Sequence, residues 1–224
     1  MTVDFQALRT KMVDGQLRTT DVTNTDILDA MLAIPREEFV PARLRPLAYI
    51  DEDIEVAAAS GGRPARHIIE PSPFARQVQL AGIRSGDLVL DVGCASGYSS
   101  AVLSRLSSFV VALESDAELA RLAGETLSRL GFDNVSVVEG ALPSGHAAQA
   151  PYDVIVLNGA VDEVPAALFD QLKEGGRLVA VVGGGNAGRA TLFVKDGGLI
   201  SRRHGFNAAL PPLPGFGREP VFEL

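Results

Sequence analysis

The spacing of apolar positions changes along the chain, and the change separates an N-terminal part from the rest. Residues 4–47 carry apolar side chains at intervals of three and four, which is typical of amphipathic helices. Two prolines divide this stretch into short helices, because a helix usually ends before a proline. The residues that define the pattern are the apolar Ile27, Met31, Leu32 and Ile34, the capping candidates Thr23, Asn24 and Thr25, and the helix breakers Pro35 and Pro41.

The next stretch, residues 51–72, has a different composition. An acidic run, Asp51-Glu52-Asp53, precedes a segment at 57–64 that is rich in alanine and glycine and ends in proline. Clusters of this kind are typical of loops. We therefore expect residues 51–72 to form a loop rather than a helix or strand, and we consider it a candidate substrate-facing loop.

From residue 73 onward, short apolar runs alternate with helical patterns, as they do in βαβ units with a parallel sheet. Residues 190–206 predict two antiparallel strands that turn at Asp196-Gly197-Gly198, and the proline-rich residues 210–220 predict an irregular tail. We expect one compact α/β domain, with an N-terminal helical segment and substrate-facing loop at 1–72 and the core at 73–224. The predicted strands are 88–90, 109–113, 135–138, 154–157 and 178–182, and the predicted helices are 98–106, 117–130 and 168–172.

Composition and charge exclude several classes of partner. The formal net charge of −8 and the pI of about 4.9 repel polyanions, so we expect neither nucleic acid nor an anionic membrane as partner. No apolar run approaches the roughly 18 residues of a membrane span, and the N-terminus lacks a signal-peptide pattern, so we expect a cytoplasmic protein. The single cysteine, Cys94, and three scattered histidines give no disulfide and no metal site. A small molecule or a protein is the expected partner, and the oligomeric state is not indicated.

The segment from Asp91 to Tyr98 carries the strongest chemical signal. A strand, a glycine-containing turn and a helix follow one another directly, which lets backbone approach a ligand and directs a helix N-terminus at it. Gly93 and Gly97 are the positions where a side chain would obstruct that approach. The spacing Gly-x-Ala-x-Gly is shorter than that of dinucleotide-binding loops. It favours a nucleoside with an amino-acid tail, although such a turn alone can be purely structural.

Glu114 is the second element of the predicted nucleoside site. It ends the next predicted strand, 17 residues after Gly97, where a carboxylate can accept hydrogen bonds from both ribose hydroxyls. Taken alone, it could equally be a surface carboxylate. Asn158 follows the fourth predicted strand at the same edge of the sheet, and it is either a site residue or a cap. Asp91 is either an acceptor for loop amides or a cofactor ligand.

The segment Ile34-Pro35-Arg36-Glu37-Glu38-Phe39-Val40-Pro41 is the most specific motif of the chain, and further motifs lie at 12–18, 30–31, 48–52, 90–93, 96–98, 151–156, 164–165 and 172–179. Through these segments most of the chain resembles the protein-L-isoaspartate O-methyltransferases, repair enzymes that methylate the abnormal carboxylate of isoaspartyl residues. The resemblance implies a Rossmann-like class I methyltransferase fold, S-adenosylmethionine as cofactor, S-adenosylhomocysteine as product, and an isoaspartyl protein or peptide as substrate.

From the loop, the spacing and the resemblance together we expect a set of cofactor-binding residues and no metal ligands. We assign no catalytic residue. The expected cofactor-binding residues are Ile68, Asp91, Gly93, Ala95, Ser96, Gly97, Tyr98, Glu114, Ser115, Gly140, Ala141 and Asn158.

The chain departs from the family pattern at three positions. The family has Ile-Ser-Gln-Pro where this chain has Ile68-Ile69-Glu70-Pro71, so Ile69 replaces a serine thought to help at the active site. The family's Gly-Asp-Gly becomes Gly140-Ala141-Leu142, which removes a carboxylate that would bind the adenine amino group, and Ala95 replaces a loop glycine.

The predicted chemistry tolerates the loss of the serine. An acceptor carboxylate is ionised at neutral pH, so methyl transfer needs alignment and desolvation rather than a general base. We therefore favour a carboxyl O-methyltransferase acting on isoaspartyl residues. Two alternatives stay open: a methyltransferase of the same fold with a changed acceptor, such as another small molecule, and a non-catalytic binding module that keeps the fold.

Overall fold

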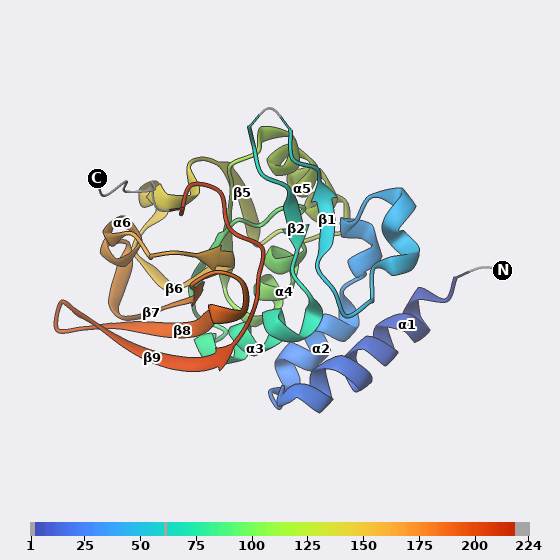
Figure 1. The fold of residues 1–224 in the computed structure, drawn as a ribbon, viewed down its shortest axis with the longest axis horizontal. Coiled ribbons are helices and arrows are strands. Elements are labelled where there is room, and N and C mark those ends of the chain that lie inside the picture. Colours follow the sequence, from blue (N-terminus) through green and yellow to red (C-terminus); the bar gives the residue numbers. More distant parts are fainter. Residues whose placement is uncertain (1–2, 61, 218–224) are drawn as a thin grey trace, which may run out of the picture.

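A seven-stranded sheet forms the centre of the computed structural model, which describes residues 3–60 and 62–217 (Figure 1). The strands lie in the order β5-β4-β3-β6-β7-β8-β9. The first five in this order are parallel, and β8 and β9 extend one edge as an antiparallel hairpin. The predicted α/β fold is therefore confirmed. The strand bounds are β3 Leu88–Val92, β4 Phe109–Glu114, β5 Val135–Glu139, β6 Tyr152–Val161, β7 Leu172–Val182, β8 Arg189–Asp196 and β9 Leu199–Asn207.

Both faces of the central parallel strands β3, β4 and β6 are buried. Val89 of β3 and Val110 of β4 belong to one apolar cluster, and their chain neighbours Leu90 and Val111 belong to a second cluster on the other face. Burial on both faces explains why these strands are continuous apolar runs. Side chains of α2 (Thr25–Ala33), α3, α4 and α5 complete the first cluster, and those of α6 and the C-terminal tail complete the second. The helix bounds here are α3 Pro71–Ala81, α4 Tyr98–Leu106, α5 Ala117–Arg129 and α6 Ala166–Asp170.

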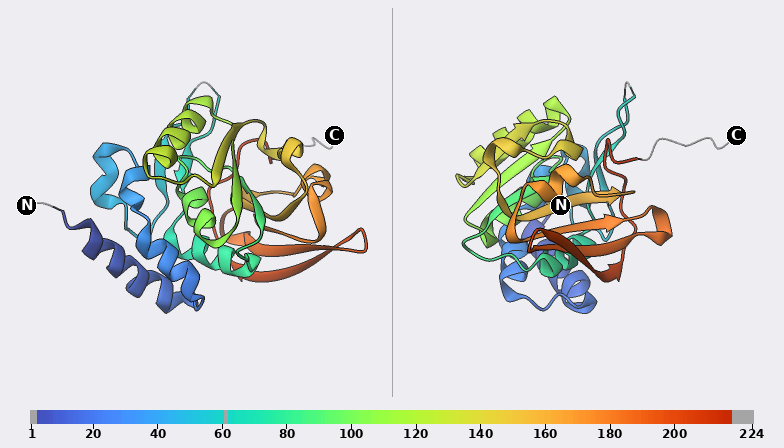
Figure 2. Two further views of the ribbon diagram at one scale, coloured as in Figure 1. Left: turned by 180° about the vertical axis from the view of Figure 1, so that it is seen from behind. Right: turned by 90° about the vertical axis from the view of Figure 1, so that its left-hand side faces the viewer.

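The N-terminal part is helical, as the sequence predicts. Asn24 caps α2 by accepting hydrogen bonds from the backbone N–H groups of Asp26 and Ile27, and the helix ends just before Pro35. Figure 2 shows these helices, in blue, gathered on one side of the sheet. No helix of the described residues is long and apolar enough to span a membrane. The N-terminal elements are α1 Phe5–Met12, a π-helical stretch Val13–Leu17, a 3-10 turn Arg18–Thr20, α2 Thr25–Ala33, and 3-10 turns Arg36–Phe39 and Ala42–Leu47.

The loop expected at 51–72 is in fact partly regular, and that prediction was wrong. Strands β1 (Ile54–Ala57) and β2 (Arg66–Ile68) pair as an antiparallel hairpin, and α3 begins at Pro71, so it crosses the boundary placed after residue 72. Ile54 and Ile68 face each other across the hairpin and are 4% and 5% exposed. Burial of such pairs decides strand formation more than local composition does, which the sequence pattern could not show.

The helix expected at 168–172 also differs. α6 ends at Asp170, and β7 begins at Leu172, before the glycine pair where the helix was expected to stop. Leu172 pairs with Tyr152 at the start of β6, and the register then shifts before Arg177 pairs with Val154. Long-range pairing with β6 therefore overrides the local helical pattern.

The C-terminal hairpin is confirmed. Asp196 pairs with Leu199 across Gly197 and Gly198, which have φ of +58° and +74°. Two consecutive positive φ values define the tight turn that suits a hairpin, and glycine adopts them without steric cost. Figure 2 shows this hairpin projecting beyond the rest of the sheet.

Candidate functional site

The candidate site lies where β3, β4 and β6 end, at the carboxyl edge of the sheet. The loop after β3 turns through Gly93, Ala95 and Gly97, with φ of +80°, +50° and +93°, and α4 begins immediately afterwards at Tyr98. The backbone N–H of Gly93 donates to the carbonyl of Leu113 at 2.8 Å, which fixes the loop to the end of β4. Carboxyl edges of open parallel sheets are where such folds bind their ligands.

Ala95 adopts a backbone conformation that favours glycine. A left-handed conformation costs a residue with a Cβ about 1 kcal/mol. Its backbone N–H donates to Glu114 Oε2 at 2.8 Å, and this hydrogen bond to a buried carboxylate helps to hold the loop in place. The alanine at this position is therefore compatible with the turn, although it is less favourable than glycine.

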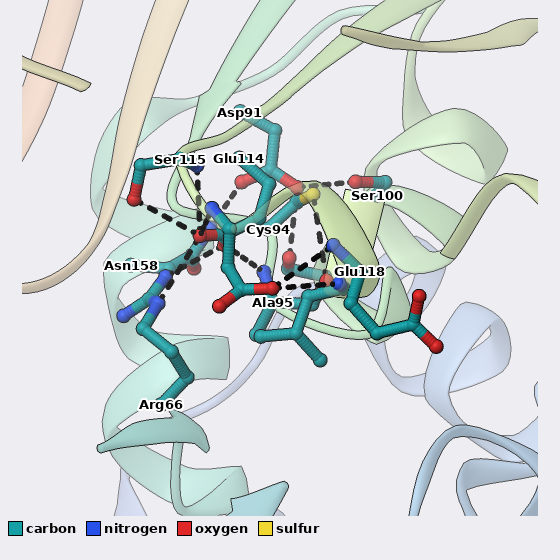
Figure 3. Close-up of polar contacts among 12 residues, drawn as sticks. Arg66, Asp91, Cys94, Ala95, Ser100, Glu114, Ser115, Glu118 and Asn158 are labelled. Carbon is teal, nitrogen blue, oxygen red and sulfur yellow. Dashed lines mark hydrogen bonds and ion pairs between the residues drawn. The ribbon is translucent and has the colours of Figure 1, made fainter. Parts of the chain in front are cut away.

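Glu114 organises the site from the end of β4. Its side chain is fully buried and accepts hydrogen bonds from the backbone N–H groups of Ala95, Ser115 and Asp116 at 2.8, 2.8 and 3.2 Å. Figure 3 shows this carboxylate at the centre of the polar network. The predicted position of a carboxylate beside the glycine loop is thus found in the structure.

Arg66 of β2 is a residue of the candidate site that the sequence did not indicate. Its Nη2 lies 2.8 Å from Glu114 Oε2 and its Nε lies 3.3 Å from Oε1, so the pair is bidentate (Figure 3). The Arg66 side chain is 6% exposed. No spacing signal could have found it, because β2 itself was expected to be loop and the two residues are 48 positions apart.

Asp91 acts as an acceptor for neighbouring side chains. The hydroxyls of Ser99 and Ser100 donate to its Oδ2 at 2.7 and 2.5 Å, and the side-chain amide of Asn158 donates to Oδ1. Complete burial raises the pKa of Asp91 to about 6, while these three hydrogen bonds favour the ionised form. Through these hydrogen bonds, the Asp91 carboxylate at the end of β3 connects the start of α4 with β6.

Several of the expected residues surround a very small cavity of about 10 Å³, which lies beside Gly93. Three residues that line it, His67, Tyr98 and Asn158, carry a buried polar atom (Nδ1, Oη and Oδ1) with no hydrogen-bond partner among the described residues, and Ser96 Oγ in the loop after β3 is likewise unpartnered. Buried polar groups of this kind are rare unless a ligand or water satisfies them. The cavity is lined by His67, Ile68, Ile69, Phe74, Gly93, Cys94, Tyr98, Ser99 and Asn158.

The remaining expected residues lie one strand further along. Gly140 follows β5, and its backbone N–H donates to the carbonyl of Glu114 at 3.0 Å. Ala141 comes next and is exposed, while Leu142 is fully buried. The described residues contain no group of three or more histidine, cysteine, aspartate or glutamate side chains placed to hold a metal ion.

The residue types at this edge fit a nucleoside with an amino-acid tail. A buried carboxylate at the end of β4, a glycine turn that opens a helix, and unpartnered polar atoms on Ser96 and Asn158 are the groups such a ligand requires. Gly93 in particular has no room for a side chain, since a Cβ there would lie 2.6 Å from Leu213 Cδ2.

Comparison with known proteins identifies the family. The pattern of the family described as "Protein-L-isoaspartate(D-aspartate) O-methyltransferase (PCMT)" matches residues 8–212. This chain belongs to that family. The predicted resemblance is therefore confirmed, and it extends over nearly the whole chain.

Individual relatives agree with this assignment. A protein-L-isoaspartate O-methyltransferase of Koribacter versatilis is 40% identical over 211 residues, which cover 94% of this chain and 92% of the relative. One from Methanopyrus kandleri is 35% identical, with 92% of each chain covered. A solved protein-L-isoaspartate O-methyltransferase superposes with a TM-score of 0.78 at 30% identity, over 92% of this chain and 66% of that one. A Plasmodium falciparum structure in complex with S-adenosyl-L-homocysteine has the same fold, with a TM-score of 0.75 at 19% identity over 95% and 99% of the two chains.

Arg36, from the most specific family segment, supports the loop that carries Ile69. Its side chain is fully buried, and it donates to the backbone carbonyls of Ala48 and Ile69, both at 2.8 Å. Its guanidinium also lies over the ring of Tyr98, 4.6 Å from the centroid. This arginine joins the N-terminal segment to the start of α3 and to α4.

We expect Arg36→Met to lower the free energy of unfolding by about 2 kcal/mol or more, because two buried carbonyls lose their donor. Urea unfolding followed by circular dichroism measures this change. Arg129→Met is the matched control, since Arg129 is 54% exposed and pairs with Glu38 at the surface. Its expected effect is below about 0.5 kcal/mol. Equal losses for both variants would contradict the role assigned to Arg36.

Proposed function

We propose that this chain is an S-adenosylmethionine-dependent carboxyl O-methyltransferase that acts on isoaspartyl residues of proteins or peptides in the cytoplasm. The observation that carries the proposal is the buried Glu114 beside the glycine turn at 93–97, in a chain whose family match runs from residue 8 to 212. The Glu114 carboxylate would accept hydrogen bonds from the ribose, and the turn would approach the amino-acid tail.

The other residues at this edge would complete cofactor binding. Ser96 and Asn158 offer the unpartnered Oγ and Oδ1 atoms, and Tyr98 forms a buried wall at the start of α4. Gly140 and Ala141 lie beyond β5, where the adenine would extend. The proposed binding residues are Ile68, Asp91, Gly93, Ala95, Ser96, Gly97, Tyr98, Glu114, Ser115, Gly140, Ala141 and Asn158, with Asp91 acting through its neighbours.

The chemistry places few demands on the protein. When bound, S-adenosylmethionine supplies an electrophilic methyl group on a sulfonium, so a C–O bond to the acceptor carboxylate forms as the C–S bond breaks. An ionised carboxylate needs no base, and the residues therefore act by orienting it and by excluding water. Ile69 lines the cavity beside Gly93 and would give the acceptor side of the proposed site an apolar wall.

Methyl transfer to a synthetic isoaspartyl peptide tests this function. We expect labelled methyl from S-adenosylmethionine to appear in a base-labile ester on the isoaspartyl peptide and not on the matched aspartyl peptide. A chain that binds S-adenosylhomocysteine but methylates no isoaspartyl peptide in a broad panel would contradict the proposed acceptor. Transfer to another small molecule would then identify a changed acceptor on the same fold.

Glu70, next to Ile69, predicts a pH dependence of this activity. Partial burial, with the carboxylates of Asp51 and Asp53 nearby, raises the pKa of Glu70 to about 7. Glu70 is therefore mostly neutral below pH 7 and mostly ionised above it, when it would repel an anionic acceptor. We expect kcat/KM to fall as pH rises from 6 to 8 in the native chain and to fall less in Glu70→Gln. The same decline in both proteins would exclude Glu70 as its cause.

A further inference from the structure

The C-terminal tail lies across the candidate cofactor site. After β9 the chain returns to the carboxyl edge of the sheet, where the N–H of Leu213 donates to the carbonyl of Ala160 and the N–H of Ala160 donates to the carbonyl of Pro211, both at 2.8 Å. Figure 1 shows this segment, in dark red, running between β6 and β2. The tail is therefore attached to the end of β6 by backbone hydrogen bonds.

Leu213 and Arg66 fill the space directly beside the glycine turn. A Cβ built on Gly93 would lie 2.6 Å from Leu213 Cδ2 and 3.0 Å from Arg66 Nη2, and one built on Gly159 would lie 2.7 Å from Leu213 Cγ. Leu213 is 3% exposed and packs in the apolar cluster that includes Leu142. The close approach that the glycines permit is thus made by two of the chain's own side chains.

Arg66 also uses the hydrogen-bonding capacity that a ribose would need. Oε2 of Glu114 accepts from the Ala95 N–H and from Arg66 Nη2, and Oε1 accepts from the N–H groups of Ser115 and Asp116 and from Arg66 Nε. A carboxylate offers about four lone-pair positions. A ribose diol can therefore bind Glu114 only if the guanidinium leaves.

The free volume at this edge is too small for a nucleoside. The cavity beside Gly93 measures about 10 Å³, and a second one, lined by Arg66, Ser115 and Pro214, measures about 30 Å³. A single water needs roughly 10–15 Å³, whereas small-molecule sites typically measure about 300–1,000 Å³. Ligand entry therefore requires the displacement of side chains.

We propose that Arg66 and Leu213 form an internal plug in the cofactor site, which S-adenosylmethionine must displace in order to bind. The Arg66 guanidinium occupies the position at Glu114 that the ribose hydroxyls would take. The Leu213 side chain occupies the space beside Gly93 that the rest of the nucleoside would take. The proposal rests on the proposed function, since it concerns the same ligand. Because ligand binds only the open form, the apparent affinity is reduced by the fraction of molecules that are open.

Calorimetric titration with S-adenosylhomocysteine tests the plug. We expect Arg66→Met to bind this ligand about tenfold more tightly than the native chain, because the ribose no longer competes with the guanidinium for Glu114. Leu213→Ala should also tighten binding. Arg129→Met is the matched control: Arg129 pairs with Glu38 at 2.9 Å, is 54% exposed and lines neither cavity, so its loss should leave the affinity unchanged.

Hydrogen exchange on the native chain provides a second measurement that needs no substitution. Ligands normally slow exchange, but here S-adenosylhomocysteine should speed exchange of the Leu213 and Ala160 amides, since the tail must move away from β6. Unchanged or slower exchange of these amides upon binding would overturn the part assigned to Leu213.

The outcomes separate this inference from the proposed function. Equal affinities of the native chain and Arg66→Met, or weaker binding by the variant, would overturn the plug and leave the cofactor assignment intact. Absence of S-adenosylhomocysteine binding in the native chain and in both variants would contradict the proposed function and the plug together.

Discussion

Glu114→Gln is expected to lower the free energy of unfolding by about 3–5 kcal/mol, because it leaves the guanidinium of Arg66 buried without its counter-charge. Arg66 is 6% exposed and Glu114 is fully buried, so water cannot replace the lost interaction. The side-chain N–H group of the new glutamine would also face N–H groups that now donate hydrogen bonds to the Glu114 carboxylate. The same variant should bind S-adenosylhomocysteine at least about tenfold more weakly, since a hydrogen bond to a charged group contributes about 1.5–3 kcal/mol. Urea unfolding and calorimetry measure the two effects.

Two comparisons isolate the cause of the instability. Arg63→Gln breaks the exposed pair with Asp116 and should cost less than about 1 kcal/mol. The double variant Glu114→Gln with Arg66→Met removes both charges and should recover much of the stability that Glu114→Gln alone loses. Additive losses in the double variant would show that the two side chains do not stabilise the fold as a pair.

Ile69→Ser is expected to raise kcat/KM for an isoaspartyl peptide by about 10- to 100-fold at saturating S-adenosylmethionine. A serine hydroxyl at this position would donate to the acceptor carboxylate, and one hydrogen bond to a charged group is equivalent to about 1.5–3 kcal/mol, or one to two decades in rate. Ile69 lines the cavity next to Gly93, which places the new hydroxyl on the acceptor side of the proposed site. Initial rates of ester formation measure the change.

Ile69→Ser should also destabilise the fold, and this loss of stability must be measured separately from the change in activity. Ile69 is 5% exposed, so its truncation should lower the free energy of unfolding by about 2–5 kcal/mol. Circular dichroism at the assay temperature shows whether the variant is folded. Ile69→Val keeps an apolar wall and should not gain activity. A folded Ile69→Ser variant without a gain would show that the hydroxyl does not orient the acceptor in this chain.

The sequence by itself determined the elements that depend on neighbouring residues. Helix α4 starts at Tyr98 because Gly97 can adopt the positive φ that the turn requires, and the apolar runs of β3 and β4 indicate strands buried on both faces. The position of Glu114 follows from the same local pattern, because it is the first polar residue after such a run. The family segment at 34–41 was equally visible, but its physical role was not.

Only the tertiary structure decided what surrounds these elements. The Arg66–Glu114 pair joins positions 48 residues apart, and Leu213 reaches Gly93 from the far end of the chain. The strands of the 54–68 hairpin form because Ile54 and Ile68 are buried together, and β7 begins at Leu172 because Tyr152 pairs with it. Contacts between distant segments depend on how the chain is packed, and the spacing of residues along the sequence does not encode them. The sequence therefore predicted a nucleoside site at the carboxyl edge of the sheet, while packing determined that Arg66 and Leu213 lie beside Glu114 and Gly93 there.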